Sequence, residues 1–318
     1  MPLSLSFVAG LPASGCAGVL GAIGFGYAQQ NRPPLDIPFA APDLAPLGGA
    51  PVLELWTSDQ PVRYSHAEGA RLAATDSLLF GALEAGDDPD APLEDATNAL
   101  YRRIFELQSS LGYPHLFRVW NYFPQITALA GGLERYRHFT LGRHDAFLAH
   151  GRAVETAPAA CALGSASGPL TILFLAGTEL GQPLENPRQT SAYRYPAQYG
   201  PRSPTFSRAL VTRAAGQSQL LISGTASIVG HESRHLDDPR AQAEEAMTNV
   251  KTLIAEARAA GLTGNRQLLL KTYIRHPAML EAVRPVVMAG LGPQDRVVFL
   301  KADICRPELL VEIEGAYI

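Results

Sequence analysis

Two glutamates near the end of the chain have the spacing of side chains on one face of a β-strand. Because side chains alternate along a strand, Glu312 and Glu314 share one face, Val311 and Ile313 fill the other, and the two glutamate Cα atoms are about 7 Å apart. Two solvated glutamates on an exposed sheet are the simpler interpretation. The group Cys305–Pro307 just upstream favours a site instead. A carboxyl whose pKa is raised by burial and a like-charged neighbour can act as a general acid near neutral pH.

Arginines and tyrosines gather in and before one long connecting segment. Arginine holds a carboxylate with two parallel hydrogen bonds, which lysine cannot do. Any one of these arginines alone is more typical of a protein surface, but their concentration beside tyrosines indicates a site for a small anion. The residues are Arg143, Arg188, Arg194, Arg202 and Arg208, with Tyr193, Tyr195 and Tyr199.

Two short motifs that suggest a metal or a cofactor stand in the wrong context. His231–His235 matches the HExxH pattern of zinc proteases, whose chemistry needs both imidazoles one turn apart on a helix. The motif precedes the helix start that Asp238 and Pro239 indicate, so we predict a solvated loop and no metal site. Gly24 and Gly26 lack the third glycine of a dinucleotide-binding fingerprint. We therefore expect no cofactor.

The composition is that of a globular protein with room for two domains, because 47% of the 318 residues are apolar and only 18% are charged. The formal net charge is -4 and no long basic run occurs, which argues against nucleic acid as a partner. The cysteines are far apart and form no CxxC pair, so we expect reduced thiols in a cytoplasmic protein. They are Cys16, Cys161 and Cys305.

The first 31 residues carry no charged side chain, and Phe7–Ala28 is rich in glycine and alanine. A signal peptide has a positive charge ahead of its apolar stretch, yet no lysine or arginine precedes Arg32. Pro12 and six glycines also interrupt the stretch, which leaves weak hydropathy for a membrane span. We predict buried strand and turn here, and no membrane association.

Two segments of the chain show the same order of predicted elements, which indicates an α+β fold with two related domains. In the N-terminal half we expect a helix, a strand, a helix and a strand at Leu93–Gly112, Phe117–Ile126, Gly132–His150 and Pro169–Ala176. The C-terminal half adds strands before and after that order. We expect them at Gln219–Val229 with a break at Gly224, a helix from Asp238 to about Ala260, a strand at Gln267–Arg275, a helix at Ala278–Ala289, and strands at Arg296–Ile304 and Leu309–Ile313.

These elements divide the chain into three parts. Residues 1–184 form the first predicted domain, 185–208 a loop rich in tyrosine and arginine, and 209–318 the second domain. Long loops inside compact domains are usually functional or disordered, and the many aromatic residues favour an ordered active-site loop.

The last part of the chain resembles the YjgF/RidA family, whose fold is chorismate-mutase-like. The resemblance lies in Ile222–Gly230, in the helix through Gln242 and Asn249, and in Val311–Glu314. It implies a mixed sheet with helices on one face, and an acidic residue at Glu312. Members of that family form trimers with sites between subunits.

A second resemblance covers nearly the whole chain and is to the chorismatase family, which needs no cofactor. It implies two YjgF/RidA-like domains, the first of them degenerate, and cleavage of chorismate. Both a monomer and a homotrimer agree with it. The matching segments are Arg118–Ile126, Gly142–Arg143 with Phe147, Tyr193–Pro196, Tyr199–Pro204 with Phe206, Arg208 and Ala209, and Cys305–Glu314.

The chemistry implied by this resemblance begins with Glu312, which protonates the enolpyruvyl methylene to give an oxocarbenium ion, and pyruvate is then released. Gly224 and Cys305 match the branch that aromatises the ring to 3-hydroxybenzoate. The resemblance also implies that the residues in contact with the substrate include Arg143, Tyr193, Tyr195, Arg208 and Thr225.

Four other functions stay open from the sequence. One is a hydrolytic chorismatase that yields a dihydroxycyclohexadiene carboxylate, and another is a mixed 3-/4-hydroxybenzoate synthase. A YjgF-like imine or enamine hydrolase would need only the C-terminal domain and leaves the N-terminal domain unexplained. A non-catalytic small-anion binder would tolerate Glu312→Gln without any change in products.

Overall fold

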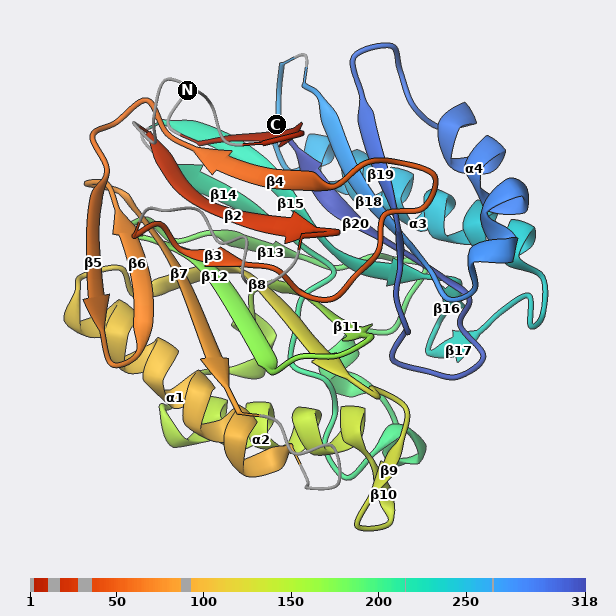
Figure 1. The fold of residues 1–318 in the computed structure, drawn as a ribbon, viewed down its shortest axis with the longest axis horizontal. Coiled ribbons are helices and arrows are strands. Elements are labelled where there is room, and N and C mark those ends of the chain that lie inside the picture. Colours follow the sequence, from red (N-terminus) through yellow and green to blue (C-terminus); the bar gives the residue numbers. More distant parts are fainter. Residues whose placement is uncertain (1–2, 11–17, 28–35, 87–92, 215, 265) are drawn as a thin grey trace.

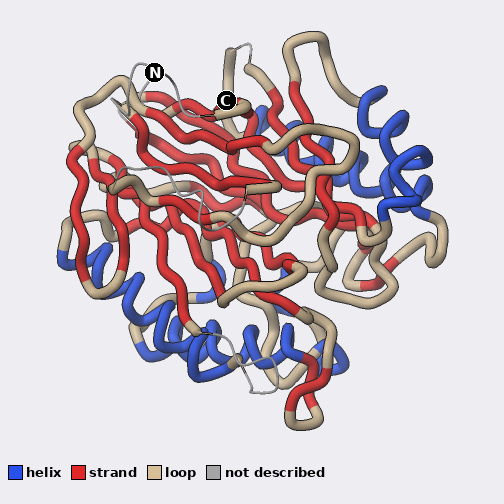
Figure 2. The backbone as a smooth tube through the Cα atoms, in the orientation of Figure 1, coloured by secondary structure: helices blue, strands red, loops and turns tan. Residues whose placement is uncertain are grey.

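The computed structural model describes residues 3–10, 18–27, 36–86, 93–214, 216–264 and 266–318, and the predicted thiol of Cys16 lies outside these ranges. Two six-stranded sheets and one four-stranded sheet form the centre of the molecule (Figure 1). The helices lie along its outer sides (Figure 2). This arrangement confirms the predicted α+β class. No helix within these ranges is long and apolar enough to cross a membrane.

The N-terminal half forms a mixed sheet in the order β11-β8-β12-β7-β6-β5, with α1 and α2 packed on one face. Leu100, Ile104 and Leu107 lie at helical spacing and bury one side of α1. A short hairpin, β9 (Leu129–Ala130) and β10 (Leu133–Glu134), precedes α2. The other elements are β5 (Arg63–Ala67), β6 (Ala70–Ala74), β7 (Leu78–Ala85), α1 (Glu94–Ser110), β8 (His115–Pro124), α2 (Arg135–Ala149), β11 (Ala159–Ser165) and β12 (Leu170–Gly177).

The C-terminal half forms a second mixed sheet in the order β13-β14-β15-β20-β18-β19, with α3 and α4 on one face. Asp238 caps α3 by accepting a 3.0 Å hydrogen bond from the Ala241 amide, as predicted. The helix α4 continues through Pro285. The elements are β13 (Gln182–Leu184), β14 (Ala209–Ala214), β15 (Gln217–Ala226), α3 (Pro239–Ala259), β18 (Leu268–Ile274), α4 (Leu280–Ala289), β19 (Arg296–Lys301) and β20 (Val311–Tyr317).

The two large sheets have one topology. The order β11-β8-β12-β7-β6-β5 corresponds strand by strand to β19-β18-β20-β15-β14-β13. Each sheet also contains one equivalent parallel pair, β8 with β11 and β18 with β19. The prediction of two related domains, each a mixed sheet with helices on one face, is therefore confirmed.

A third sheet covers the faces of the large sheets that point away from the helices. It pairs in the order β1-β4-β2-β3, and β2 is buried throughout, as predicted for that segment. Its Trp56 packs in one core with Trp120 of β8 and Tyr273 of β18. The sequence did not reveal this sheet as a separate unit. Its strands are β1 (Ser4–Val8), β2 (Val19–Phe25), β3 (Phe39–Ala40) and β4 (Val52–Thr57).

Candidate active site

Glu312 lies within β20, where it pairs with Tyr273 of β18 and Ala226 of β15. It is only 4% exposed. Burial raises the pKa of the Glu312 carboxyl from 4.5 to about 8, and the nearby Arg118 and Arg275 oppose that shift. A carboxyl with this pKa keeps its proton at neutral pH and can give it to a bound molecule.

The second glutamate of the pair, Glu314, is part of a buried group of four charges. It forms ion pairs with Arg118 and Lys271, whose Nζ atom is 2.7 Å from Glu314 and 2.5 Å from Glu54 of the small sheet. The positive and negative charges balance in this core. The prediction that a like-charged neighbour raises the pKa of Glu312 is therefore wrong, because Glu314 is paired and burial is the largest cause.

The strand β15 carries a bulge beside Glu312. The pairing of β15 with β20 shifts by one residue between Ile222 and Thr225, so an extra residue is fitted into β15. This bulge brings Gly224 against Glu312, and a Cβ atom at Gly224 would overlap with the carboxylate oxygen Oε1. The absence of a side chain at Gly224 therefore leaves space for the carboxyl group of Glu312.

Residues of the N-terminal half hold the bulge in place. Arg118 of β8 donates a 2.6 Å hydrogen bond to the carbonyl of Ile222. The hydroxyl of Ser223 accepts a hydrogen bond from the Ala160 amide of β11 at 2.9 Å and donates one to the carbonyl of Ser207 at 2.6 Å. The position of Gly224 beside the acid thus depends on both halves of the chain.

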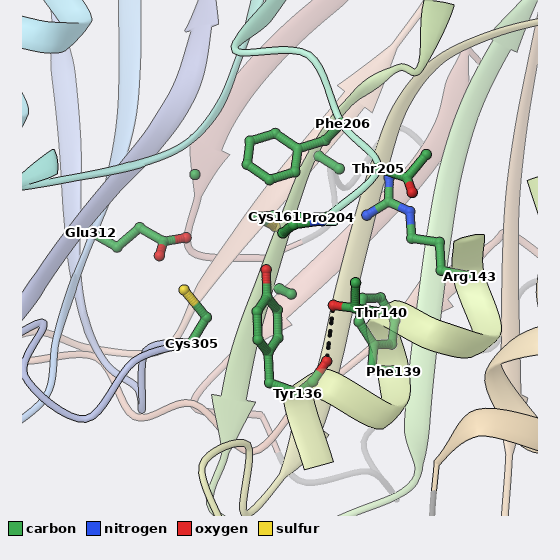
Figure 3. A pocket seen from close by; sticks show the side chains of 13 residues that line it. Tyr136, Phe139, Thr140, Arg143, Cys161, Pro204, Thr205, Phe206, Cys305 and Glu312 are labelled. Atoms are coloured by element: carbon green, nitrogen blue, oxygen red, sulfur yellow. Dashed lines mark hydrogen bonds between the residues drawn. The ribbon is translucent and has the colours of Figure 1, made fainter. Parts of the chain in front are cut away.

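Two adjoining hollows meet at Glu312. Both are lined by Tyr136, Pro204, Phe206, Gly224, Cys305 and Glu312. The first, the Arg143 hollow, also includes Arg143, Thr140 and Cys161, and Figure 3 shows Glu312 and Arg143 entering it from opposite sides. The second, the Arg306 hollow, also includes Arg137, Tyr195, Tyr199, Arg208 and Arg306.

Arg143 supplies a buried cation to the first hollow. It is 3% exposed, and within the described part of the chain its Nε and Nη2 atoms have no hydrogen-bond partner. Its guanidinium lies 5.1 Å from the ring centre of Tyr101 and 5.9 Å from that of Phe147. Because burying unpaired donors of a cation is costly, this arrangement favours an anionic ligand in the hollow.

Arginines packed on tyrosines form one wall of the second hollow. The Nη2 atom of Arg208 donates to the Tyr195 hydroxyl and to the Thr190 carbonyl, both at 2.7 Å. The guanidinium of Arg306 lies 3.9 Å from the ring centre of Tyr199. It also donates to the carbonyl of His231 at 3.0 Å. These contacts hold two guanidinium groups beside the acid.

Three comparisons identify relatives of this chain. A chorismatase of Streptomyces hygroscopicus is 40% identical over 272 residues, which cover 82% of this chain and 78% of the relative. A 3-hydroxybenzoate synthase of the same organism is 36% identical over 301 residues, which cover 90% and 86%. This chain belongs to the chorismatase family. A model of that family, described as chorismatase FkbO/Hyg5-like, N-terminal, matches residues 54–176.

A solved chorismatase structure extends this family relationship to the fold. It is 35% identical to this chain and superposes with a TM-score of 0.86. The match covers 99% of this chain and 98% of that chain, so it includes the small sheet as well as both large sheets.

Seven of the residues singled out from the sequence line this chorismatase-family site. Glu312, Gly224 and Cys305 line both hollows, Arg143 lines the first, and Tyr195, Tyr199 and Arg208 line the second. The candidate arginines Arg188, Arg194 and Arg202 do not line the hollows. Two of the residues expected to contact the substrate also lie elsewhere among the described residues. Tyr193 packs against Arg194 at 5.7 Å, and the Thr225 hydroxyl donates to the carbonyl of Ser223 at 2.8 Å, so neither belongs to the lining of the hollows.

Sequence reasoning missed Tyr136, Arg137 and Arg306 as lining residues. Arg306 had a signal, because it stands next to Cys305 in a group that pointed to a site. Tyr136 and Arg137 had none, since they lie in the first turn of α2 and nothing in a helical pattern tells which turn borders a hollow.

The two described cysteines are thiols in the folded protein. Burial, with a smaller contribution from Glu312, raises the pKa of Cys305 to about 12. Burial likewise raises the pKa of Cys161, although Arg118 opposes it. A thiol that keeps its proton is a poor nucleophile, so Cys305 contributes shape and polarity to the hollows.

The HExxH segment is not helical. It begins just after β16 (Ile228–Val229) and contains β17 (Glu232–Ser233), which pairs with β16 as a hairpin. The Nδ1 atom of His231 lies 3.2 Å from the Tyr199 hydroxyl. The prediction that this motif lies outside a helix is confirmed, and the one-turn geometry of a zinc protease cannot form here. Within the described ranges, no cluster of three metal-ligating side chains occurs.

Proposed function

We propose that the protein is a chorismatase that cleaves chorismate to pyruvate and 3-hydroxybenzoate, with Glu312 as the proton donor. One observation carries this proposal. Glu312 is a buried carboxyl with a pKa of about 8, and it lies where two arginine-lined hollows meet. The named activities of relatives that are 36% and 40% identical over most of the chain support the same substrate.

The two hollows suit a substrate with two carboxylates. Chorismate carries one carboxylate on its ring and another on its enolpyruvyl group. Arg143 offers two unpaired donors in the first hollow, and Arg208 and Arg306 border the second. We assign one carboxylate to each hollow, which sets the enolpyruvyl ether between them, beside Glu312.

The proposed reaction begins with transfer of the Glu312 proton to the enolpyruvyl methylene carbon. The resulting oxocarbenium ion carries its charge at the ether carbon and oxygen, and the carboxylate of Glu312 then faces it. The oxygen of the neighbouring ring hydroxyl then attacks the ring carbon that carries the ether, and the bond from this carbon to the ether oxygen breaks, so that the ether oxygen leaves as the keto oxygen of pyruvate. The hydroxyl proton returns to Glu312. The resulting ring epoxide opens, and transfer of a ring proton to its oxygen aromatises the ring to 3-hydroxybenzoate. The two products together contain all the atoms of chorismate, so this branch adds no water and needs no cofactor.

Gly224 and Cys305 favour the aromatising branch in this proposal. Both residues line the region shared by the two hollows, next to the acid. The segment 185–208 acts as the active-site loop, since Tyr195 and Tyr199 from it wall the second hollow. Tyr193 and Thr225 have no direct role, because they do not line the hollows.

The test is incubation of the metal-stripped protein with chorismate, followed by chromatography and a pyruvate assay. Pyruvate with an equal amount of 3-hydroxybenzoate supports the reaction and the branch. Pyruvate with a non-aromatic diol keeps the chorismatase activity and replaces the branch by hydrolysis. No pyruvate contradicts the proposal, and imines become the next substrates to try.

A further inference from the structure

Tyr136 lies at the junction of the two hollows. It is one of six residues that line both, together with Glu312 and Cys305. It stands in the first turn of α2, and its ring stacks on Phe139 with 6.4 Å between ring centres. Its amide donates to the carbonyl of Ile126 at 2.9 Å. The side chain is therefore held in a fixed direction, and Figure 3 shows its hydroxyl pointing into the hollow between Glu312 and Arg143.

The side-chain hydroxyl of Tyr136 has no hydrogen-bond partner within the described residues. The hydrogen bond from the Thr140 hydroxyl, at 3.0 Å, goes to the backbone carbonyl of Tyr136 instead. The other tyrosines beside Glu312 have their hydroxyls engaged. That of Tyr195 accepts from Arg208, and that of Tyr199 lies within hydrogen-bond distance of His231. Tyr136 thus presents an unused phenol at the place where the reacting atoms must lie.

The phenol of Tyr136 also keeps its proton. Burial is the largest cause of the raised pKa of Tyr136, and the nearby Cys305 and Glu312 raise that pKa further. The positive charges of Arg143 and Arg306 act in the opposite direction and do not overcome burial. A neutral phenol is both a donor and an acceptor, which is what a substrate hydroxyl needs as a partner.

We propose that Tyr136 is a further catalytic residue, whose phenol holds the ring hydroxyl of chorismate next to the enolpyruvyl ether. The inference rests on the proposed function, because it takes the position of the substrate from the two arginine-lined hollows and the acid. With its carboxylates in the two hollows, the substrate places its ether beside Glu312. The neighbouring ring hydroxyl then lies at the junction, where Tyr136 is the hydroxyl-bearing side chain among the six shared residues.

The consequence concerns the choice between two nucleophiles. When the oxocarbenium ion forms, either the ring hydroxyl displaces pyruvate at the ring carbon that carries the ether, or a water molecule adds to the ether carbon of the enolpyruvyl group and the diol results. A hydrogen bond from Tyr136 keeps the ring hydroxyl in the attacking position and occupies the space where water would enter. Tyr136 therefore controls the ratio of 3-hydroxybenzoate to non-aromatic diol.

The experiment compares the products of the wild-type protein and Tyr136→Phe, which keeps the ring and its stacking on Phe139. We expect the ratio of 3-hydroxybenzoate to diol to fall by about fivefold and kcat to fall by a similar factor, which is the effect of losing one neutral hydrogen bond. KM should change less than kcat. A product ratio does not depend on the fraction of folded protein, so it reports on Tyr136 even if the variant is less stable.

The matched control is Tyr64→Phe, which removes a hydroxyl that donates to the Val19 carbonyl on the β5 side of the molecule. It should leave the ratio unchanged. If the wild-type protein forms 3-hydroxybenzoate and Tyr136→Phe keeps both the ratio and kcat within twofold, the inference about Tyr136 is overturned and the chorismatase proposal stands. A wild-type protein that makes only the diol overturns this inference and the 3-hydroxybenzoate branch but keeps the chorismatase activity, and one that releases no pyruvate overturns all three.

Discussion

The two six-stranded sheets share one topology and differ at the equivalent pair of central strands. In the N-terminal sheet, β12 pairs with β7 over eight residues without a shift, and all eight residues of β12 are apolar or small and buried. In the C-terminal sheet, β20 pairs with β15 through a bulge and carries Glu312 and Glu314. This strand pair is thus regular in the N-terminal half and irregular in the C-terminal half, although β12 shifts register against its other neighbour, β8, between Leu175 and Ala176. We call the two halves regular and irregular after this pair.

The two halves contribute different parts of the site. The regular half supplies one wall of the first hollow, with Tyr136 and Arg143 on α2 and Ala160 on β11. The irregular half supplies the acid, and its bulge is held by hydrogen bonds from the regular half. A bulge leaves one residue unpaired and changes the direction of the neighbouring side chains, and such bulges are common beside active sites.

The largest expected effect comes from removing the acid of the irregular half. Glu312→Gln should lower the rate of pyruvate release by about a thousandfold, because general acid catalysis contributes factors of this size. Steady-state pyruvate assays measure it, and circular dichroism should show a native fold. The control is Glu84→Gln on β7 of the regular half. Near-wild-type turnover by Glu312→Gln would remove Glu312 from the mechanism.

The role of the bulge is tested by adding a methyl group at Gly224. Gly224→Ala places a Cβ atom where Glu312 Oε1 lies, so the carboxyl must move and pyruvate release should fall by about a hundredfold. The matched control is Gly86→Ala after β7, where a Cβ atom would meet nothing within 4 Å. Equal activities of the two variants would mean that the contact between Gly224 and Glu312 is unimportant.

The pH dependence of activity follows from the raised pKa of Glu312. A proton donor works only in its protonated form, so kcat/KM should be steady below pH about 8 and fall about tenfold per pH unit above it. Initial rates across pH 5 to 10 measure the profile. A profile that falls already from about pH 4.5 would mean that the carboxyl of Glu312 has an ordinary pKa.

The raised pKa of Glu312 also predicts that the free energy of unfolding falls as the pH rises. The folded-state pKa of Glu312 is raised, so its contribution to stability is fully present below pH about 4.5 and is lost as the pH rises towards 8. Relative to Glu312→Gln, the wild-type free energy of unfolding should fall over this range by on the order of 5 kcal/mol. Urea unfolding of both proteins at pH 4, 6 and 9 checks it, and a difference independent of pH would contradict it.

The smallest expected effect concerns Cys305. Because its thiol is protonated and lines both hollows, Cys305→Ala should change the ratio of 3-hydroxybenzoate to diol by a few fold and leave total pyruvate release within about threefold. Chromatography of the products measures it. An unchanged ratio would count against a role of Cys305 in the choice of branch.

Most of the fold was predictable from local patterns, whereas the assignment of Glu312 as the acid came from the resemblance to the chorismatase family. The cap at Asp238 and the apolar spacing in α1 predicted helices that the structure confirms, because both signals act within one turn or one face. The alternation around Glu312 predicted a strand for the same reason. The small sheet was missed because its strands β2 and β4 are far apart in the sequence, and no local pattern shows that they pair with each other.

The sequence by itself determined most of the elements and the arginine-rich character of the site, since composition and periodicity act locally, and its resemblance to the chorismatase family pointed to Glu312. Only the tertiary structure decided which polar groups are buried together. Among the described residues, Glu314 forms ion pairs while Glu312 does not, although both lie on one strand face, and Tyr136 reaches the junction of the hollows from the N-terminal half of the chain. Burial and pairing depend on what packs against a side chain, and that partner is set by long-range contacts that no local pattern records.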